Sequence, residues 1–185
     1  MPNETEIKFA VADVEALREK LRRAGFREVT PHTHEMNVLF DFPGRTLRRR
    51  GELLRLRKYG EQWTLTHKAR GAPGKHKTRE ETESRVADGT ALTAIFRRLG
   101  LQESFRYEKF RSEWTDGRGE VVVDETPIGN MAEIEGAADW IDKTAHALGV
   151  APQQYITKSY AELFGEWRKR TRSKATAMTF EACRR

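Results

Sequence analysis

The sequence predicts an α+β fold: a closed antiparallel β-barrel of about eight strands, with helices packed outside it. About seven segments alternate between charged and mostly apolar residues, as strands with two different faces do. Their charged faces place carboxylates beside carboxylates and bases beside bases, which repel one another unless something lies between them. A barrel that encloses water and a charged ligand meets this requirement, because it avoids the dry burial of ions.

The first strand is expected at the amino terminus. In Glu4-Thr5-Glu6-Ile7-Lys8, alternation places Glu4, Glu6 and Lys8 on one face and Thr5 and Ile7 on the other. An exposed amphipathic edge strand explains this segment equally well by itself. The barrel is favoured because the same arrangement recurs in later segments, whose charged faces carry Arg55 and Arg57, Lys68, Arg79 with Glu81 and Glu83, Lys109 and Arg111, Asp124, and Glu133 with Glu135.

Turn and breaker residues divide the later strands. Gly60-Glu61 has the length of a tight hairpin connection, and Asp116-Gly117 is a second turn signal. The strands expected after the first cover residues 36–42, 52–59, 62–68, 78–85, 105–114, 120–126 and 131–135. The basic run 45–50 is interpreted as a solvated loop, with a basic lip that attracts a polyanion as the alternative.

Four helices are expected on the outside of the barrel. Asp13 and Asp88 are typical N-cap residues, each followed by apolar residues at helical spacing and then by a glycine. A third helix is expected from about residue 139 to 148, and the last begins near Ser159. The apolar stripes of these helices are interpreted as packing faces against the barrel.

Length and charge indicate one globular domain. The chain has 185 residues, of which 37% are hydrophobic and 34% charged. The formal net charge is +6, but residues 168–185 contain seven Lys and Arg and one Glu, so the rest of the chain has equal numbers of bases and acids. We therefore expect a domain over residues 1–170 and a basic, mobile tail over residues 171–185.

Other features restrict the class of protein. Cys183 is the only cysteine, which excludes an internal disulfide and fits a reducing cytoplasm. The amino terminus does not have the pattern of a secretory signal, and no apolar run reaches the length that a membrane span needs. His32 and His34 have no third soft ligand nearby and are interpreted as ordinary histidines. We expect a cytoplasmic protein, monomeric or homodimeric.

Together, these residues resemble a known family. Glu4-x-Glu6-x-Lys8 is similar to the ExExK signature of CYTH domains, the triphosphate tunnel metalloenzymes, and the later charged residues follow in that family's order to about residue 160. The resemblance implies that Glu4, Glu6, Glu133 and Glu135 bind metal, and Asp124 supplies a further carboxylate of the kind that Mg²⁺ or Mn²⁺ prefers. It implies that a triphosphate is bound by Lys8, Arg55, Arg57, Lys68, Arg79, Lys109 and Arg111, with Lys158 closing over it.

The residue types agree with this chemistry. Arginine offers a planar fork to two phosphate oxygens, and carboxylates are the oxygen ligands that Mg²⁺ or Mn²⁺ prefers. A hard dication between acids and phosphate removes their repulsion. Glu81 and Glu83 are expected at the catalytic centre with Lys8 and Lys158; they bind metal, position water, or orient Arg55 and Arg57.

The leading hypothesis is a metal-dependent phosphohydrolase acting on inorganic triphosphate or an organic triphosphate. The alternatives are a class IV-type adenylyl cyclase that forms cyclic AMP, and a thiamine triphosphatase. A non-catalytic polyphosphate- or RNA-binding module is a remoter alternative, because the basic tail offers only Phe180 as a stacking platform and the inner acids have no role in such a module. The expected partner is therefore a small-molecule triphosphate, not a membrane or a nucleic acid.

Overall fold

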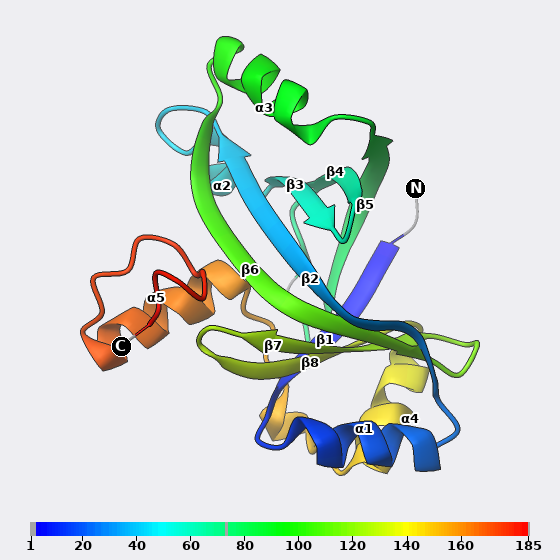
Figure 1. Ribbon diagram of the computed structural model, residues 1–185. Helices are drawn as coiled ribbons and strands as arrows, with labels where there is room; N and C mark the ends of the chain where they lie inside the picture. The colour runs from blue at the N-terminus through cyan, green and yellow to red at the C-terminus, as the bar shows by residue number, and fades with distance from the viewer. Residues whose placement is uncertain (1–2, 73, 185) are drawn as a thin grey trace.

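The computed structural model describes residues 3–72 and 74–184 and confirms the predicted fold class. Eight antiparallel strands close into a barrel in the order β1-β5-β4-β3-β2-β6-β7-β8 (Figure 1). The strands are β1 (Asn3–Val11), β2 (Arg27–Asp41), β3 (Leu53–Tyr59), β4 (Gln62–Lys68), β5 (Lys77–Val86), β6 (Gln102–Thr115), β7 (Glu120–Thr126) and β8 (Gly129–Glu135). The α-helices are α1 (Val14–Arg23), α2 (Thr46–Arg50), α3 (Gly89–Arg98), α4 (Ala138–Leu148) and α5 (Tyr160–Thr171).

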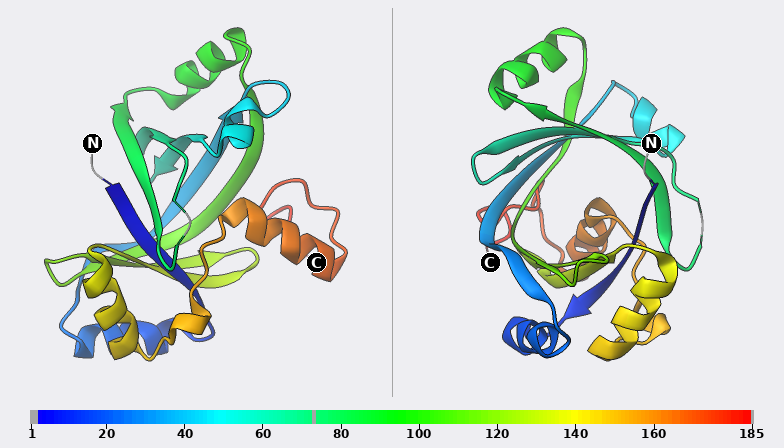
Figure 2. Two further views of the ribbon diagram at one scale, coloured as in Figure 1. Left: turned by 180° about the vertical axis from the view of Figure 1, so that it is seen from behind. Right: turned by 90° about the vertical axis from the view of Figure 1, so that its right-hand side faces the viewer.

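The expected cap residues begin their helices. The Asp13 carboxylate accepts a hydrogen bond from the backbone N–H of Ala16, and Asp88 caps α3 in the same way. Ser159 and Glu162 form a reciprocal capping box at the start of α5. This box holds the first turn of α5 in a defined position beside one end of the barrel (Figure 2).

Two predicted elements differ from the structure. Strand β2 is 15 residues long, although alternation predicted only residues 36–42; its exposed first half pairs with β6 through register shifts near Thr30. Residues 46–50, predicted as a loop, form α2. The buried carboxylate of Asp41, which precedes α2 in the sequence, accepts hydrogen bonds from the backbone N–H groups of Leu47 and Arg48. It thereby satisfies two N–H groups of the first turn that have no partner within the helix.

The hydrophobic core lies outside the barrel, between the strands and the helices. The outward face of β1 contributes Ile7 and Phe9, and α1 and α4 cover it with Leu21 and Ile141, all in one buried cluster. A second cluster lies under α5, and a third lies under α3. None of the helices in the described ranges is long and apolar enough to cross a membrane.

Residues 172–184, predicted as part of a mobile tail, are packed against β6. Met178 is fully buried and exchanges two backbone hydrogen bonds with β6, through Arg106 and Glu108. The ring of Phe180 packs 5.5 Å from that of Phe110, and Cys183 is buried beside α5. The tail was predicted to be mobile because this segment contains many bases. In the structure, the side chains of Met178, Phe180 and Cys183 attach it to the barrel and to α5.

We expect Met178→Ala to lower the free energy of unfolding by about 2–5 kcal/mol, because it leaves a cavity in a fully buried cluster. Denaturant unfolding measures this loss. Thr176→Ala, an exposed change two residues earlier, is the control and should alter stability by less than about 0.5 kcal/mol. If the two variants are equally stable, residues 172–184 are detached in solution.

Candidate functional site

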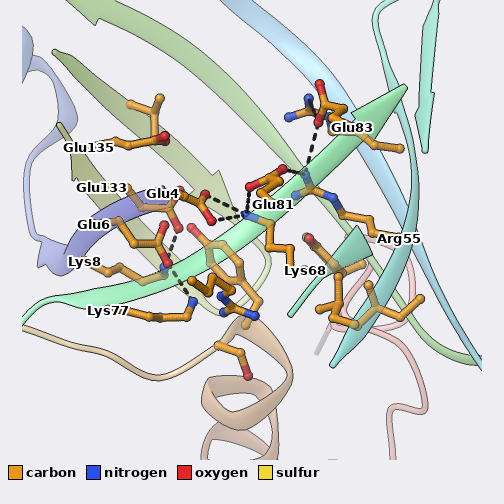
Figure 3. A pocket seen from close by; sticks show the side chains of 18 of the residues that line it. Glu4, Glu6, Lys8, Arg55, Lys68, Lys77, Glu81, Glu83, Glu133 and Glu135 are labelled. Carbon is orange, nitrogen blue, oxygen red and sulfur yellow. Dashed lines mark hydrogen bonds and ion pairs between the residues drawn. The ribbon is translucent and has the colours of Figure 1, made fainter. Parts of the chain in front are cut away.

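The barrel encloses a cavity of about 700 Å³ whose walls are charged (Figure 3). Among the described residues, its lining contains as many acids as bases, eight of each. The acids are Glu4, Glu6, Glu81, Glu83, Glu113, Glu120, Glu133 and Glu135. The bases are Lys8, Arg55, Arg57, Lys68, Lys77, Arg79, Lys109 and Arg111.

Strand alternation puts these side chains inside. On β1, Ile7 points outward into the fully buried core, so Glu6 and Lys8 on either side of it point inward. The pairing register then places Glu6 opposite Glu135 and Lys8 opposite Glu133 on β8. Residues far apart in the sequence therefore meet because the barrel is closed.

Glutamates on one wall are paired with lysines. Glu4 accepts hydrogen bonds from Lys68 at 2.6 Å, and Glu6 accepts one from Lys77 at 2.6 Å. Glu133 is paired with Lys8. Burial opposes the ammonium form of Lys8, but Glu133 and Glu6 outweigh it, so the pKa of Lys8 is raised. At Lys77 burial has the larger effect and lowers the pKa, despite the contact with Glu6.

Glu135 differs from the other glutamates of this wall. Burial raises the pKa of its carboxyl to about 8, and the nearby carboxylates of Glu4 and Glu6 add to the rise. Glu135 thus lies near two other carboxylates, and within the described residues it makes no ion pair of its own, whereas Glu4 and Glu6 are paired with Lys68 and Lys77. A cation between them would lower this repulsion.

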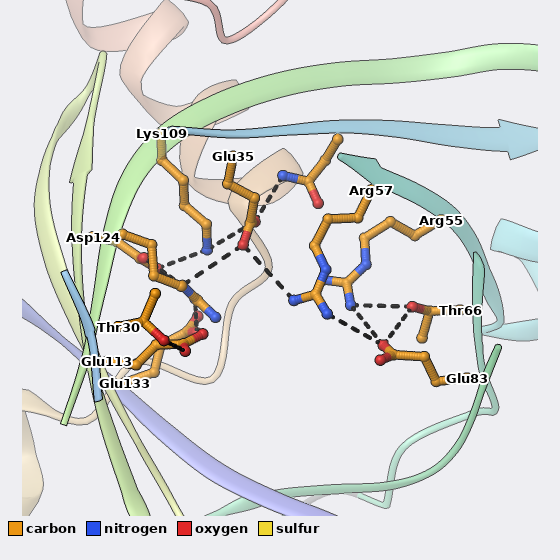
Figure 4. Close-up of polar contacts among 12 residues, drawn as sticks. Thr30, Glu35, Arg55, Arg57, Thr66, Glu83, Lys109, Glu113, Asp124 and Glu133 are labelled. Atoms are coloured by element: carbon orange, nitrogen blue, oxygen red, sulfur yellow. Dashed lines mark hydrogen bonds and ion pairs between the residues drawn. The ribbon is translucent and has the colours of Figure 1, made fainter. Parts of the chain in front are cut away.

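The two arginines of β3 lie on the opposite wall (Figure 4). Arg57 is 3.4 Å from Glu83, and Arg55 is 3.8 Å from Glu81 and 3.9 Å from Glu83. The Thr66 hydroxyl also donates a hydrogen bond to Glu83. This geometry fits the reading in which Glu81 and Glu83 orient the two guanidinium groups.

Glu35 is the acid around which the remaining bases gather. Its carboxylate is fully buried and lies 3.4 Å from Lys109, 3.7 Å from Arg57 and 3.9 Å from Arg111. Burial opposes ionisation, but Lys109 and Arg111 outweigh it and hold the pKa of Glu35 well below its usual range. Glu35 therefore remains charged and draws together three bases from two strands, Arg57 of β3 and Lys109 and Arg111 of β6.

Asp124, a predicted metal ligand, does not line the cavity. Its fully buried carboxylate accepts four hydrogen bonds: two from Arg111, one from Lys109 at 2.8 Å and one from the Tyr160 hydroxyl at 2.6 Å. These donors occupy both oxygens. The geometry therefore gives Asp124 the position of a brace that joins β6 and β7 to the start of α5.

Lys158, predicted to close over a ligand, also lies outside the cavity lining. Its ammonium is half exposed and pairs with Glu166 of α5 at 2.5 Å. The residues of this segment that line the cavity are Ser159, Tyr160 and Ala161. His32 and His34, which were interpreted as ordinary histidines, lie on the outer surface of the barrel, where His32 pairs with Glu125 and His34 with Glu108.

Sequence reasoning missed several polar residues of this site, among them Glu35, Lys77, Glu113, Glu120 and Tyr160. Alternation was the available signal for Glu113, which continues the inward face of Lys109 and Arg111, and for Glu120, which shares a face with Val122. Lys77 shares the inward face with Arg79, but the strand was predicted to begin one residue later. Glu35 lies just before the predicted start of β2, and its alternation with the buried Asn37 was the available signal. Tyr160 lies in the predicted last helix, and no sequence signal places its hydroxyl against Asp124.

The donor set fits a hard divalent cation. Glu4, Glu6, Glu133 and Glu135 offer carboxylate oxygens from two adjacent strands, and the other three carboxylates add to burial in raising the pKa of Glu135. Within the described ranges, no three acidic, histidine or cysteine side chains already surround one point. Glu4, Glu6 and Glu133 instead contact Lys68, Lys77 and Lys8, which an ion would have to replace.

Comparisons with known proteins agree with this architecture. A curated protein of Methanocaldococcus jannaschii named "Putative adenylate cyclase MJ0240" is 27% identical over 173 residues, which cover 88% of this chain and 98% of that protein. The solved structure of the PH1819 protein from Pyrococcus horikoshii has a TM-score of 0.74 and 26% identity, covering 88% of this chain and 98% of the other.

A Hippeastrum protein is more distant in sequence. It is 19% identical and has a TM-score of 0.66, and the alignment covers 88% of this chain and 95% of the Hippeastrum chain. That protein is described as an adenylyl cyclase candidate with a dominant triphosphatase activity. The family model for the CYTH domain matches residues 2–160, which is most of the chain. The charged, closed barrel and this match together establish that the chain belongs to the CYTH domain family.

Proposed function

We propose that this protein is a metal-dependent phosphohydrolase that binds a triphosphate inside the barrel. The observation that carries the proposal is the cavity lining, in which bases able to bind phosphate face carboxylates able to hold a cation. Neither set alone suits a polyanion. The acids repel it, and the bases are already neutralised by the acids.

Binding of the triphosphate would exchange one set of ion pairs for another. Arg55 and Arg57 lie 3.4–3.9 Å from Glu81 and Glu83, which is longer than the usual hydrogen bond between charged groups. A small movement away from these carboxylates is therefore enough for the two guanidinium groups to bind phosphate oxygens. Lys109 and Arg111 are held by Asp124 and stay fixed. The bases are therefore positioned before the substrate enters.

Mg²⁺ or Mn²⁺ is the proposed cofactor, held by Glu4, Glu6, Glu133 and Glu135. When bound, such an ion neutralises the charge that develops on a transferring phosphoryl group and activates the attacking water. Lys68, Lys77 and Lys8 are now paired with these glutamates and would be available to phosphate oxygens with a dication bound there. The lining thus offers acids to a dication and bases to a triphosphate.

Adenylyl cyclase activity is the second candidate, supported by the name of the relative from M. jannaschii. Cyclisation requires the nucleoside to be fixed so that its 3′-hydroxyl reaches the α-phosphorus. The aromatic side chains of the lining are Phe105, Tyr107 and Tyr160, and Tyr107 already stacks on both of the others. This packing leaves little open ring surface for adenine and favours hydrolysis.

Turnover of inorganic triphosphate should require Mg²⁺ or Mn²⁺. Phosphate release is measured on chelator-treated protein, before and after each metal is added back. Turnover should disappear with the metal and return with it, while the circular dichroism spectrum stays unchanged because the core does not include the acids. Full turnover in excess chelator, with metal removal verified, would contradict the proposal.

Replacing cavity residues should separate binding from turnover. Arg57→Ala should weaken triphosphate binding about ten- to a hundredfold, because it removes a charge-assisted contact worth roughly 1.5–3 kcal/mol. Glu6→Gln should instead lower kcat strongly, because it removes a metal ligand. Steady-state kinetics and calorimetry check both. Arg22→Ala, on the exposed face of α1, is the control; if it behaves like the other two, the assignment fails.

With ATP, the products should be mainly phosphate or pyrophosphate, with little cyclic AMP. Inorganic triphosphate should be turned over at least as well as ATP, because it has no nucleoside to place. Chromatography of the products formed with each metal measures the ratio. Cyclic AMP as the dominant product, with inorganic triphosphate inert, would decide for the cyclase.

A further inference from the structure

Five exposed arginines form a cluster outside the cavity, which we call the arginine lip: Arg45, Arg48, Arg49, Arg50 and Arg70. The first four lie on or directly before α2. Within the described part of the chain, none of the five makes an ion pair, whereas the bases that line the cavity lie among carboxylates. The lip therefore carries positive charge that is not neutralised by an ion pair among the described residues.

The arginine lip continues two strands of the barrel beyond the cavity. Strand β3 begins at Leu53, two residues after Gly51, the residue that ends α2. Strand β4 ends at Lys68, two residues before Arg70. Leu53 and Lys68 are paired in the register, and both line the cavity. The side chain of Arg70 packs so closely over Gly51 that a Cβ there would lie 2.9 Å from its Cγ.

Helix α5 lies at the same end of the barrel. Figure 2 shows α2 and α5 on one side and the start of β1 on the other. The first turn of α5 lines the cavity, and hydrogen bonds from Ser159 lower the pKa of Glu162 in that turn, with Lys77 and Arg48 adding to the effect. Arg48 thus lies close enough to the mouth of the cavity to act on a charged group there.

The opposite end of the barrel is acidic. Glu120 at the start of β7 is paired with Glu135 at the end of β8, and Glu113 lies near the end of β6. All three line the cavity. A polyanion that projects from the cavity is therefore repelled at this end and attracted at the end that carries the arginine lip.

The backbone of the lip is held in place. Asp41, which is 5% exposed, accepts hydrogen bonds from the backbone N–H groups of Phe42 at 2.7 Å, Leu47 at 2.9 Å and Arg48 at 3.0 Å. Gly51 ends α2 with φ of 78°, a value that glycine adopts without strain. The arginines therefore project from a fixed turn, although their side chains are free in solvent.

We propose that the arginine lip binds the phosphates of a linear polyphosphate that extend beyond the cavity. The substrate class would then include inorganic chains longer than triphosphate, with one end inside the barrel and the rest along α2. This inference rests on the proposed function, because the cavity must hold the leading phosphates. It adds a second anion-binding surface that triphosphate itself does not reach.

The test compares the binding of inorganic triphosphate and of a longer linear polyphosphate, with Mg²⁺, by calorimetry. The variant is the triple change Arg48→Gln, Arg49→Gln and Arg50→Gln, which keeps helix propensity and the backbone N–H groups that Asp41 binds. The control removes three exposed cations from α1 and α4, as Arg22→Gln, Arg23→Gln and Lys143→Gln. Circular dichroism verifies that both variants are folded.

The wild type should bind the longer chain more tightly than triphosphate. The triple change at the lip should weaken binding of the longer chain on the order of tenfold, since three exposed ion pairs of modest strength are lost, and should change triphosphate binding much less. The control should change neither. Equal affinity of the wild type for both chains, or no effect of the triple change, would overturn the inference. Failure of triphosphate to bind at all would instead overturn the proposed function.

Discussion

The structure depends on one constraint: each strand sends charged side chains into the barrel and apolar side chains outward. A small barrel normally fills its interior with apolar side chains. Here the interior is charged, so the hydrophobic core lies between the outer face of the barrel and the helices that cover it. Ile7 and Ile134, which are fully buried against α1 and α4, are neighbours in sequence of the acids and bases of the cavity.

The same constraint explains how the interior remains stable without a ligand. Ions taken out of water cost several kcal/mol each unless they are paired and hydrogen-bonded. Several pairs in this barrel join strands that are distant in sequence, such as Lys68 with Glu4 and Lys8 with Glu133. Some pairs are saturated and fixed, like those of Asp124, and others are loose, like those of Arg55. This division separates groups that hold the barrel together from groups that can exchange their partners for phosphate.

Alternation in the sequence was sufficient to predict which face of each strand points inward. Glu6, Arg57 and Glu133 were assigned correctly to the interior because each lies beside an apolar residue that had to be outside. Alternation cannot show which inward carboxylate is saturated, and so it could not distinguish Asp124 from Glu135. That distinction depends on Tyr160, which reaches Asp124 from a helix 36 residues away.

The remaining differences have the same origin in long-range contacts. Helix α2 is only five residues long and depends on Asp41, which precedes it by several residues. The first half of β2 has an exposed, polar sequence and is a strand because β6 pairs with it. Residues 172–184 looked like a solvated tail because bases outnumber apolar residues there, yet Met178 alone makes two backbone hydrogen bonds with β6.

The central claim is that phosphates and a divalent cation occupy opposite walls of one cavity. It is tested most directly by a crystal structure with Mn²⁺ and a non-hydrolysable triphosphate analogue, with the metal located by anomalous scattering. The account predicts a manganese peak beside Glu4, Glu6 and Glu135, with phosphate density beside Arg55 and Arg57. Phosphate density confined to the outer surface, or a manganese peak away from these glutamates with the cavity empty, would contradict it.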